Sequence, residues 1–391
     1  MDNKLSLIFT GDIGFDKYMD QRWKAPDLVD KDIRAYLSSA DHVIVNVEGP
    51  FSKPEINGAA DGVNSLKHGM DPDAAVFIRD LNADIFNINN NHIMDAGEKG
   101  MKDTLEISNS LGAMTIGAGM NLNEASAPVF FNEAGGIGLL SVGYERACRK
   151  AGDDTPGCLN FSDMDIIRDR IAMIKGRSRY CVVIAHDGEE FTALPSPYTR
   201  DRYHSYLEMG ADIVVAHHPH VPMNYETVGD KIIFYSLGNF IFDTDYQRSQ
   251  KNTERGLFVK LTFDEEGYGF EPYGILIDRE KERIVPYDLP DIFEDVQPDE
   301  YEKLLPLASK MLIENMKKQQ RYLFPDKYKD ATEKDWYDNF YEPMRSGRVP
   351  GKLLDFQIVY PLSEKAAEGT WKDSSLLKVK NFILEQIPDL K

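Results

Sequence analysis

The stretch Asp212–His220, DIVVAHHPH, decides the fold, because an apolar strand passes directly into three histidines. Polar residues end four earlier strands in the same way, in the segments Gly11-Asp12, Asn46-Val47-Glu48, Asn89-Asn90-Asn91-His92 and His186-Asp187-Gly188-Glu189-Glu190. Ligand sites of open α/β sheets lie outside the carboxyl ends of the strands. We therefore expect these five segments to meet in one crevice.

Short apolar runs alternate with amphipathic stretches, which is the rhythm of βαβ units and indicates a layered sheet covered by helices. Strands are predicted at residues 5–9, 42–47, 85–88, 114–116, 137–142, 180–185, 212–216, 231–235 and 240–242. Helices are predicted at residues 27–39, from residue 71 onward, and at 97–111, 164–175 and 198–209.

After Arg255 the pattern changes to two hairpin-like strands, at residues 256–263 and 269–277. An acidic stretch that contains prolines follows, and we place a domain boundary there. The expected division is a main domain over residues 1–288 and a helical C-terminal region over 289–391 packed on it. Helices are expected at 301–319 and 375–386.

Composition excludes several classes of protein. The chain has 391 residues, of which 42% are hydrophobic and 28% charged, as in a globular protein. Its net charge of -20 argues against nucleic acid as a partner, because binding duplexes requires many Lys and Arg residues. No apolar run reaches the roughly 18 residues of a membrane-spanning helix, and no signal peptide is recognised.

The three cysteines, Cys148, Cys158 and Cys181, are an odd number without Cys-x-x-Cys spacing. They argue against a disulfide framework and against a thiolate zinc site. A reducing, cytoplasmic location is expected.

A crevice that contains Asp12, Glu48 and several imidazoles needs a positive charge at its centre. Two carboxylates ~4 Å apart repel by about 4 kcal/mol at an effective dielectric near 20, and a divalent cation reverses that sign. Carboxylate, amide and imidazole ligands suit Zn, Mn or Fe, and a bridging carboxylate suits a pair of ions ~3.5 to 4 Å apart. The sequence therefore predicts one or two divalent transition metals and a metal-bound hydroxide as nucleophile.

This order of motifs resembles the calcineurin-like metallophosphoesterases, and within them the CapA/PgsA family associated with poly-gamma-glutamate capsule synthesis. The resemblance spans roughly residues 5–245. It is carried by Gly11-Asp12, Asn46-Val47-Glu48, Asn90-Asn91-His92 with Asp95 and Gly97, His186 with Gly188 and Glu190, Gly210-Ala211-Asp212, His217-His218-Pro219-His220 and Tyr235-Ser236-Leu237-Gly238-Asn239-Phe240. It implies a four-layer α/β/β/α metallophosphatase-like sandwich, to which the C-terminal region adds a helical appendage.

The resemblance also implies roles for individual residues. The positions that match the metal ligands of the superfamily are Asp12, Glu48, Asn91, His186, His218 and His220, with Glu48 in the bridging place. His92 matches the general acid that protonates a leaving group. Two positions depart from the pattern: Gly14 stands where the superfamily has a ligand His, which leaves Asp16 or another group to substitute, and Asp187 stands where the family often has Trp. Many members also carry an N-terminal membrane anchor, which we do not find here.

Several residues also have structural interpretations. A lone Asp12 after a strand is usually a turn former, and Asp95 with Glu98 has the spacing of a capping box that would also hold His92. We expect His42, His68 and His204 to be solvated or packed, Glu189 to be solvated, and His217 to point away from His218 and His220. Glu190 is predicted to be a catalytic or substrate-orienting group. Ser236, Asn239 and Asp187 are the predicted substrate contacts, although residues 235–240 also suit a tightly packed loop.

The predicted function is a metal-dependent hydrolase of the CapA/calcineurin-like type, which acts on a phosphoester or a glutamyl-type amide. The alternative is a non-catalytic or accessory component of poly-gamma-glutamate capsule biosynthesis that binds polymer or phosphate. Expected partners are a small molecule or polyglutamate, with no nucleic acid and no membrane segment. Fold alone does not separate these functions.

Overall fold

The structure, a computed structural model, describes residues 4–54, 67–143 and 149–336. Its larger sheet has eight strands, and seven of them run in the order β16-β15-β14-β1-β2-β3-β4 while β13 pairs with β1. β1 to β4 are parallel, and β14 to β16 continue the sheet as antiparallel strands. The bounds are β1 (Leu5–Ile13), β2 (His42–Val47), β3 (Ala83–Asn87), β4 (Met114–Ile116), β13 (Asn239–Ile241), β14 (Arg255–Phe263), β15 (Tyr268–Asp278) and β16 (Arg283–Pro286).

A second sheet of six strands has the order β11-β12-β10-β9-β7-β6, with its central strands parallel. Its strands are β6 (Val129–Phe131), β7 (Ile137–Gly143), β9 (Tyr180–His186), β10 (Ile213–His217), β11 (Tyr225–Val228) and β12 (Lys231–Phe234). β5 (Ala118–Gly119) and β8 (Gly157–Cys158) form a small separate pair.

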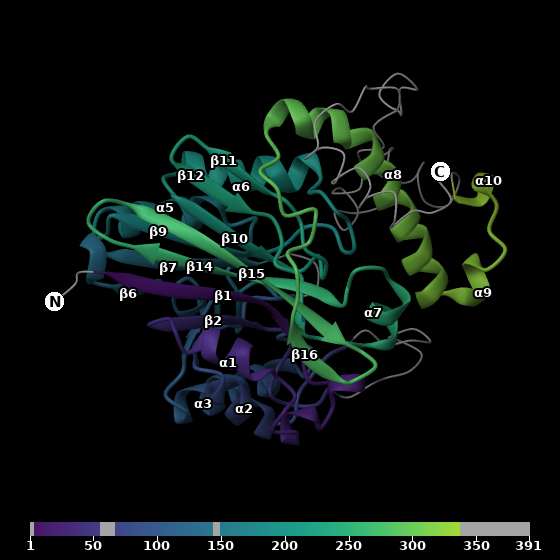
Figure 1. Cartoon of the computed structure of the whole chain (residues 1–391), viewed down its shortest axis with the longest axis horizontal. Helices are drawn as coiled ribbons and strands as arrows, with labels where there is room; N and C mark the ends of the chain where they lie inside the picture. Colours follow the sequence, from purple (N-terminus) through teal and green to yellow (C-terminus); the bar gives the residue numbers. More distant parts are fainter. Residues whose placement is uncertain (1–3, 55–66, 144–148, 337–391) are drawn as a thin grey trace.

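Helices cover the outer faces of both sheets (Figure 1). α1 (Lys31–Leu37), α2 (Asp73–Asp80) and α3 (Gly97–Ser110) pack on the larger sheet, whereas α5 (Met164–Lys175) and α6 (Pro197–Glu208) pack on the smaller one. The remaining helices are α4 (Leu122–Ala125), α7 (Asp245–Ser249), α8 (Pro298–Leu323), α9 (Pro325–Tyr328) and α10 (Glu333–Trp336).

Three hydrophobic cores separate the four layers. Alternate residues of each strand point to opposite faces, so that Phe9 of β1 enters the core between the sheets while Ile8 faces the helices. On β9, Val182 likewise faces the other sheet and Val183 faces α5 and α6. The predicted four-layer α/β/β/α architecture is confirmed.

Sequence and structure differ at helix ends, and the strands β5, β6, β8, β11 and β16 and the short helices α4 and α7 were not predicted. The helix expected at 27–39 is limited to α1, because the Asp30 side chain accepts a hydrogen bond from Asp32 N and caps the helix there. The helix expected at 301–319 begins earlier, with Pro298 in its first turn. The helix expected at 375–386 lies outside the described residues. The boundary near residue 288 stays a prediction.

Two further observations concern the chain as a whole. Among the described residues, no helix has both the length and the apolar character needed to cross a membrane. Cys158 is disulfide-bonded, which the sequence argument did not expect, while Cys181 is a buried free thiol. The cysteines therefore do not support a reducing compartment, and the cytoplasmic location stays a prediction without that support.

Glu226 on β11 ties α6 to the segment that follows β12. Its carboxylate accepts hydrogen bonds from Arg200 Nε and Nη2 at 2.9 and 2.6 Å and from the Tyr235 hydroxyl at 2.7 Å, and His204 Nε2 lies 3.2 Å away. Burial by itself raises the pKa of Glu226, but these hydrogen bonds outweigh it and lower the pKa to about 2.

We expect Glu226→Gln to lower the free energy of unfolding at pH 7 by roughly 2 kcal/mol. Because the folded pKa lies below the ordinary value of 4.5, the stabilisation is present above that pH and is lost as the pH falls toward 2. Urea unfolding of wild type and variant at pH 7 and pH 3.5 checks the sign. Equal stabilities at pH 7, or a difference that grows in acid, would show that this network does not stabilise the fold.

Candidate metal centre

The strands of both sheets end at one place. On the larger sheet Asp12 lies opposite Asn46, and on the smaller sheet His217 lies opposite His186. The two sheets are joined there by His217, whose Nε2 is 2.8 Å from the carbonyl oxygen of Thr10. The polar segments that end the strands therefore converge, as the sequence pattern predicted.

Glu48, His186 and His218 form the innermost group of possible ligands. Their ligand atoms all lie within 4.8 Å of one another. His186 Nε2 is 3.4 Å from Glu48 Oε1 and 2.8 Å from the Asn91 side-chain oxygen. Glu48 and His186 are fully buried, so water screens their interaction little.

The backbone of the HHPH segment turns two imidazoles into the crevice. His218 and His220 have φ values of 99° and 59°, in the left-handed region that non-glycine residues rarely adopt. Strain of this kind costs on the order of 1 to 3 kcal/mol for each residue and persists where surrounding contacts impose it. One such contact is the hydrogen bond of 2.8 Å from Phe191 N to the carbonyl oxygen of Pro219.

Asp12 belongs to a second group of buried polar side chains, with His220 and Asn239, beside the first. Its Oδ2 is 3.2 Å from Nδ1 of His220, and the same nitrogen lies 3.0 Å from the Asn239 side-chain oxygen. The pairing of β1 shifts register on both sides of Asp12, against β2 before it and against β13 after it. Gly11 allows β1 to approach residue 238, because a Cβ there would lie 2.3 Å from the Gly238 carbonyl oxygen.

A chain of buried amides connects the two groups. The Asn46 amide donates to Asp12 Oδ1 at 2.8 Å and to Glu48 Oε2 at 2.7 Å. The Asn46 oxygen in turn accepts from Asn87, whose own oxygen accepts from Ser141 at 2.6 Å. These contacts fix both carboxylates in orientation. The sequence placed Asn46 at a strand end but did not identify this role for it.

The donor set fits a divalent cation. Glu48 Oε1 is buried and has no hydrogen-bond partner among the described residues, although such atoms are normally satisfied. Burial opposes ionisation of Glu48, but His186, His92 and His220 hold the pKa of its carboxyl well below the usual value. Burial and the neighbouring His186 and His220 hold the pKa of His218 well below that of a free imidazole. Carboxylate and neutral imidazole are the forms that bind metal ions.

His92 lies at the edge of the Glu48 group, with its Nε2 4.0 Å from Glu48 Oε1. Its Nδ1 is 2.6 Å from Asp95 Oδ2. Burial lowers the pKa of His92, but the charges of Asp95 and Glu48 and the Asp95 hydrogen bond raise it above the ordinary value. The predicted capping box of Asp95 and Glu98 is wrong, because the N-cap of α3 is Ala96 and makes no side-chain cap. The accompanying expectation, that Asp95 holds His92, is confirmed.

His68 is a member of the site that sequence reasoning missed. Its ring is 4.3 Å from the ring of His92, its backbone N–H donates to Asp95 Oδ2 at 2.7 Å, and its Nδ1 is 2.5 Å from Asp16 Oδ2. Asp16 therefore faces His68. No sequence signal marks His68, because it lies in a loop and not at a strand end.

The space beside Gly14 is filled by Phe242. A Cβ on Gly14 would lie 2.4 Å from Phe242 Cδ2, so that a larger residue there would displace the ring. Phe242 also stacks on His220, with ring centres 5.0 Å apart and planes 10° apart. Gly14 is thus coupled, through Phe242, to the packing of a ligand candidate.

The other predicted site residues have partners within the protein. Asn239 accepts from His220 and donates to Gln247 and to the carbonyl oxygen of Thr253. The Ser236 hydroxyl oxygen accepts from Gly238 N. Asp187 is buried and pairs with Arg202. Their assignment to substrate stays a prediction.

Glu189, expected in solvent, is buried, and that expectation was wrong. Its carboxylate accepts hydrogen bonds from Ser196 N at 2.9 Å, from the Ser196 hydroxyl at 2.5 Å and from the Thr199 hydroxyl at 3.1 Å, at the start of α6. Glu190 is the member of this pair that faces the histidines, as its ligand atom lies within 4.8 Å of those of His218 and His220.

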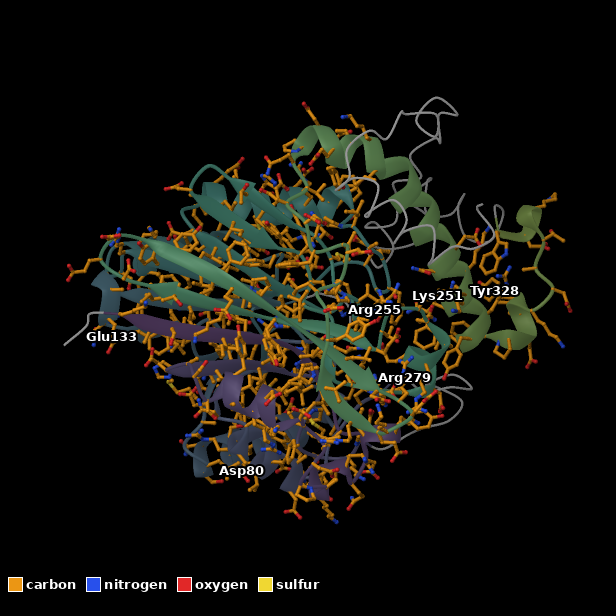
Figure 2. The ribbon with its side chains drawn as sticks, viewed as in Figure 1. Asp80, Glu133, Lys251, Arg255, Arg279 and Tyr328 are labelled. Carbon is orange, nitrogen blue, oxygen red and sulfur yellow. The ribbon has the colours of Figure 1, made fainter. Side chains whose placement is uncertain are left out.

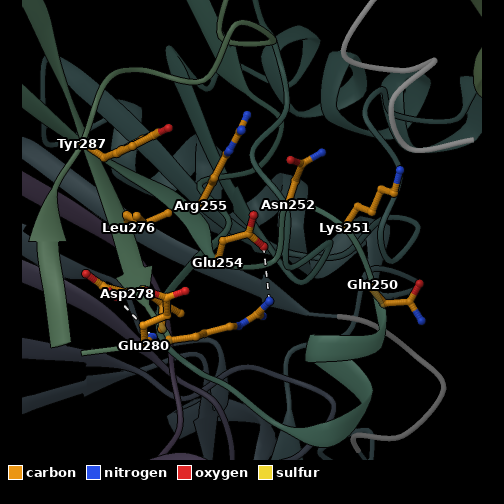
Figure 3. A pocket seen from close by; sticks show the side chains of 11 residues that line it. Gln250, Lys251, Asn252, Glu254, Arg255, Leu276, Asp278, Glu280 and Tyr287 are labelled. Carbon is orange, nitrogen blue, oxygen red and sulfur yellow. Dashed lines mark hydrogen bonds and ion pairs between the residues drawn. The ribbon is translucent and has the colours of Figure 1, made fainter. Parts of the chain in front are cut away.

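A surface pocket of about 700 Å³ lies next to α7, and none of its lining residues is a ligand candidate. Figure 2 labels three of the residues that line it, Lys251, Arg255 and Arg279, and Figure 3 shows the pocket from close by. Its lining includes three cationic residues, Lys251, Arg255 and Arg279, and three carboxylates, Glu254, Asp278 and Glu280. Arg279 is engaged by Glu254, Asp243 and Thr253. Because the charges balance, this pocket does not favour an anionic polymer.

Fold and site together define a class of protein: a four-layer α/β/β/α sandwich with a buried carboxylate and histidine centre at the carboxyl ends of its strands. A family model described as "Bacterial capsule synthesis protein PGA_cap" matches residues 6–244. The chain belongs to this family, and the predicted membership is confirmed.

Named relatives are similar over the same part of the chain. "PGA biosynthesis protein CapA" of Bacillus subtilis (strain 168) is 31% identical over 254 residues, which are 64% of this chain and 66% of the relative. "Capsule biosynthesis protein CapA" of Bacillus anthracis is 28% identical over 258 residues, 64% of this chain and 62% of the relative. The chain therefore spans slightly less than two thirds of the length of these relatives.

The matches among solved structures are more distant. The 5'-nucleotidase from Candida albicans SC5314 has a TM-score of 0.41 and 9% identity, covering 68% of this chain and 50% of that one. The protein TT1561 of Thermus thermophilus has a TM-score of 0.37 and 10% identity, covering 68% of this chain and 98% of that one.

Proposed function

We propose that this chain is a metal-dependent hydrolase in which Glu48, Asn91, His186 and His218 hold a divalent cation. The observation that carries the proposal is the buried convergence of Glu48, His186 and His218, with ligand atoms within 4.8 Å of one another. A cation bound there supplies a Lewis acid and lowers the pKa of its water, so that a nucleophile exists at neutral pH. The proposed cation is a transition ion such as Zn, Mn or Fe.

His92 is the proposed general acid. Asp95 fixes Nδ1 at 2.6 Å, which leaves Nε2 directed toward the Glu48 group. An imidazole held protonated by a carboxylate can donate its Nε2 proton to a leaving oxygen or nitrogen as the bond to it breaks. His68 supports this arrangement, because its backbone N–H donates to the oxygen of Asp95 that faces His92.

The substrate class is a phosphoester or a glutamyl-type amide. The phosphoester is supported by the resemblance to metallophosphoesterases, and the amide by the printed names of the Bacillus relatives, which concern PGA and capsule biosynthesis. The net charge of -20 repels a long polyanion, so that recognition of an acidic polymer would depend on the cation itself.

A specific observation favours a second candidate, an accessory role without turnover. A relative from Mycobacterium tuberculosis, 26% identical over 195 residues that are 44% of this chain and 49% of the relative, is named "Probable polyglutamine synthesis accessory protein". In that role the centre would be structural or would bind carboxylates of a polymer. The arrangement of the ligands suits this accessory role equally well, but the His92–Asp95 pair would then take part in no reaction.

A substrate panel separates the two candidates. Metal-loaded protein is offered an aryl phosphomonoester, an aryl phosphodiester and a γ-glutamyl anilide, and release of the chromophore is followed with and without a chelator. The hydrolase proposal predicts chelator-sensitive turnover of at least one of the three. Cation binding together with no turnover of any of the three would favour the accessory role.

A further inference from the structure

Helix α8, which lies beyond the residues matched by the family model, contacts the loop that carries Glu190. Gln319 Nε2 donates to Glu190 Oε2 at 2.7 Å, and Asn315 Nδ2 donates to the carbonyl oxygen of Phe191 at 2.6 Å. Tyr322 packs on Tyr246 of α7, with ring centres 4.6 Å apart. Residues 315, 319 and 322 share one face of the helix. α8 therefore presents a continuous face to this loop and to α7, beside which it lies in Figure 1.

The same loop is fixed to the HHPH segment. Phe191 has a φ of 59°, and its ring lies 5.8 Å from that of His220 with the planes 24° apart. Its N–H donates to the carbonyl oxygen of Pro219 at 2.8 Å. Held between α8 and this segment, Glu190 brings its carboxylate within 4.8 Å of the ligand atoms of His218 and His220.

His220 has one ring nitrogen left for a ligand. Its Nδ1 faces Asp12 Oδ2 and the Asn239 oxygen, at 3.2 and 3.0 Å. Nε2 is consequently the nitrogen that can take a cation. Phe242 stacks on the His220 ring and fills the space beside Gly14. The carboxylate of Glu190 lies within 4.8 Å of the ligand atom of His220.

We propose that Glu190, with His220 beside His218, forms a second cation position whose geometry depends on Gln319 of α8. This inference rests on the proposed function, because it presumes a first cation at Glu48, Asn91, His186 and His218. His218 borders both positions and serves the first. The second position has fewer protein ligands than the first, and it therefore binds more weakly.

Binding of Mn²⁺ alone tests the inference, with equilibrium dialysis for stoichiometry and electron paramagnetic resonance for the coupling of two neighbouring ions. Wild type is expected to bind two ions and to show the coupled signal. Glu190→Gln is expected to bind one ion at concentrations that saturate wild type, without the coupled signal. Gln319→Ala is expected to weaken the second ion by roughly 10- to 100-fold, the usual effect of removing a group that orients a ligand.

Gln320→Ala is the matched control, since the neighbouring residue on α8 is also a half-buried glutamine. It is expected to behave as wild type. Unfolding midpoints of the metal-free proteins identify any variant that loses ions by misfolding, and Gln319→Ala, at a half-buried position, keeps the test valid if Glu190→Gln unfolds.

Two outcomes separate this inference from the function on which it rests. A wild-type protein that binds no ion contradicts the proposed function itself. Two ions in wild type and also in folded Glu190→Gln, or a single ion whose affinity neither variant changes, overturns the inference and leaves a hydrolase with a different second position or with one cation.

Discussion

Glu48→Gln is expected to abolish cation binding at the first position. The substitution keeps the size of the side chain and removes the charge between His186 and His218, where the carboxylate is fully buried. Even the interaction of unit charges ~4 Å apart is worth about 4 kcal/mol at an effective dielectric near 20, and the bound ion is divalent and closer. We therefore expect affinity to fall at least roughly 1,000-fold. Isothermal titration of metal-free protein with Zn²⁺ or Mn²⁺ measures the change.

Glu226→Gln provides the matched control for that experiment. It is the same substitution at another buried glutamate, whose charge is balanced by the Arg200 side chain and not by a bound metal ion. It should lower stability and leave cation affinity as in wild type. If Glu48→Gln binds the ion as tightly as wild type does, the first position is not where we place it.

His92→Ala is expected to reduce kcat by roughly 100- to 10,000-fold on substrates with a poor leaving group, the usual contribution of general acid catalysis. The cation content should stay unchanged, because His92 Nε2 is 4.0 Å from Glu48 Oε1 and His92 is not among the proposed ligands. An activated aryl leaving group needs no proton, so that the loss should be much smaller on a nitrophenyl ester. Steady-state rates on both kinds of substrate measure this split.

His42→Ala is the control for His92→Ala. His42 is also paired with an aspartate, with Nδ1 2.6 Å from Asp84 Oδ2, but it begins β2 at the end opposite to the site. Its removal should leave kcat unchanged. An equal loss in His92→Ala on activated and unactivated substrates would indicate a structural role for His92 and would remove the general acid from the account.

How much could be read from the sequence depended on the kind of contact. The residues at strand ends were predictable, because parallel strands such as β9 and β10 bring their carboxyl ends together in register, and His186 and His217 lie side by side as a result. The convergence of strand ends follows from a local pattern that the fold must respect.

Contacts made by loops and by α8 were not predictable. His68 reaches His92 from a loop, and Gln319 reaches Glu190 across 129 positions of sequence, with no periodic pattern to mark either residue. Glu189 was expected in solvent because it is charged and lies in a loop, and only the three-dimensional path shows that Ser196 and Thr199 satisfy it. The predicted capping box at Asp95 was wrong for a related reason: the Asp95 carboxylate contacts the His92 ring and accepts a hydrogen bond from the His68 N–H.

The most direct test is the metal content of the wild-type protein after exposure to a mixture of divalent transition ions and removal of excess by gel filtration. The central claim is that Glu48, Asn91, His186 and His218, from distant parts of the sequence, surround a cation whose charge offsets the burial of the carboxylate. We predict at least one tightly held transition ion for each wild-type chain and none at the first position in Glu48→Gln. A folded wild-type chain that retains no ion would contradict it.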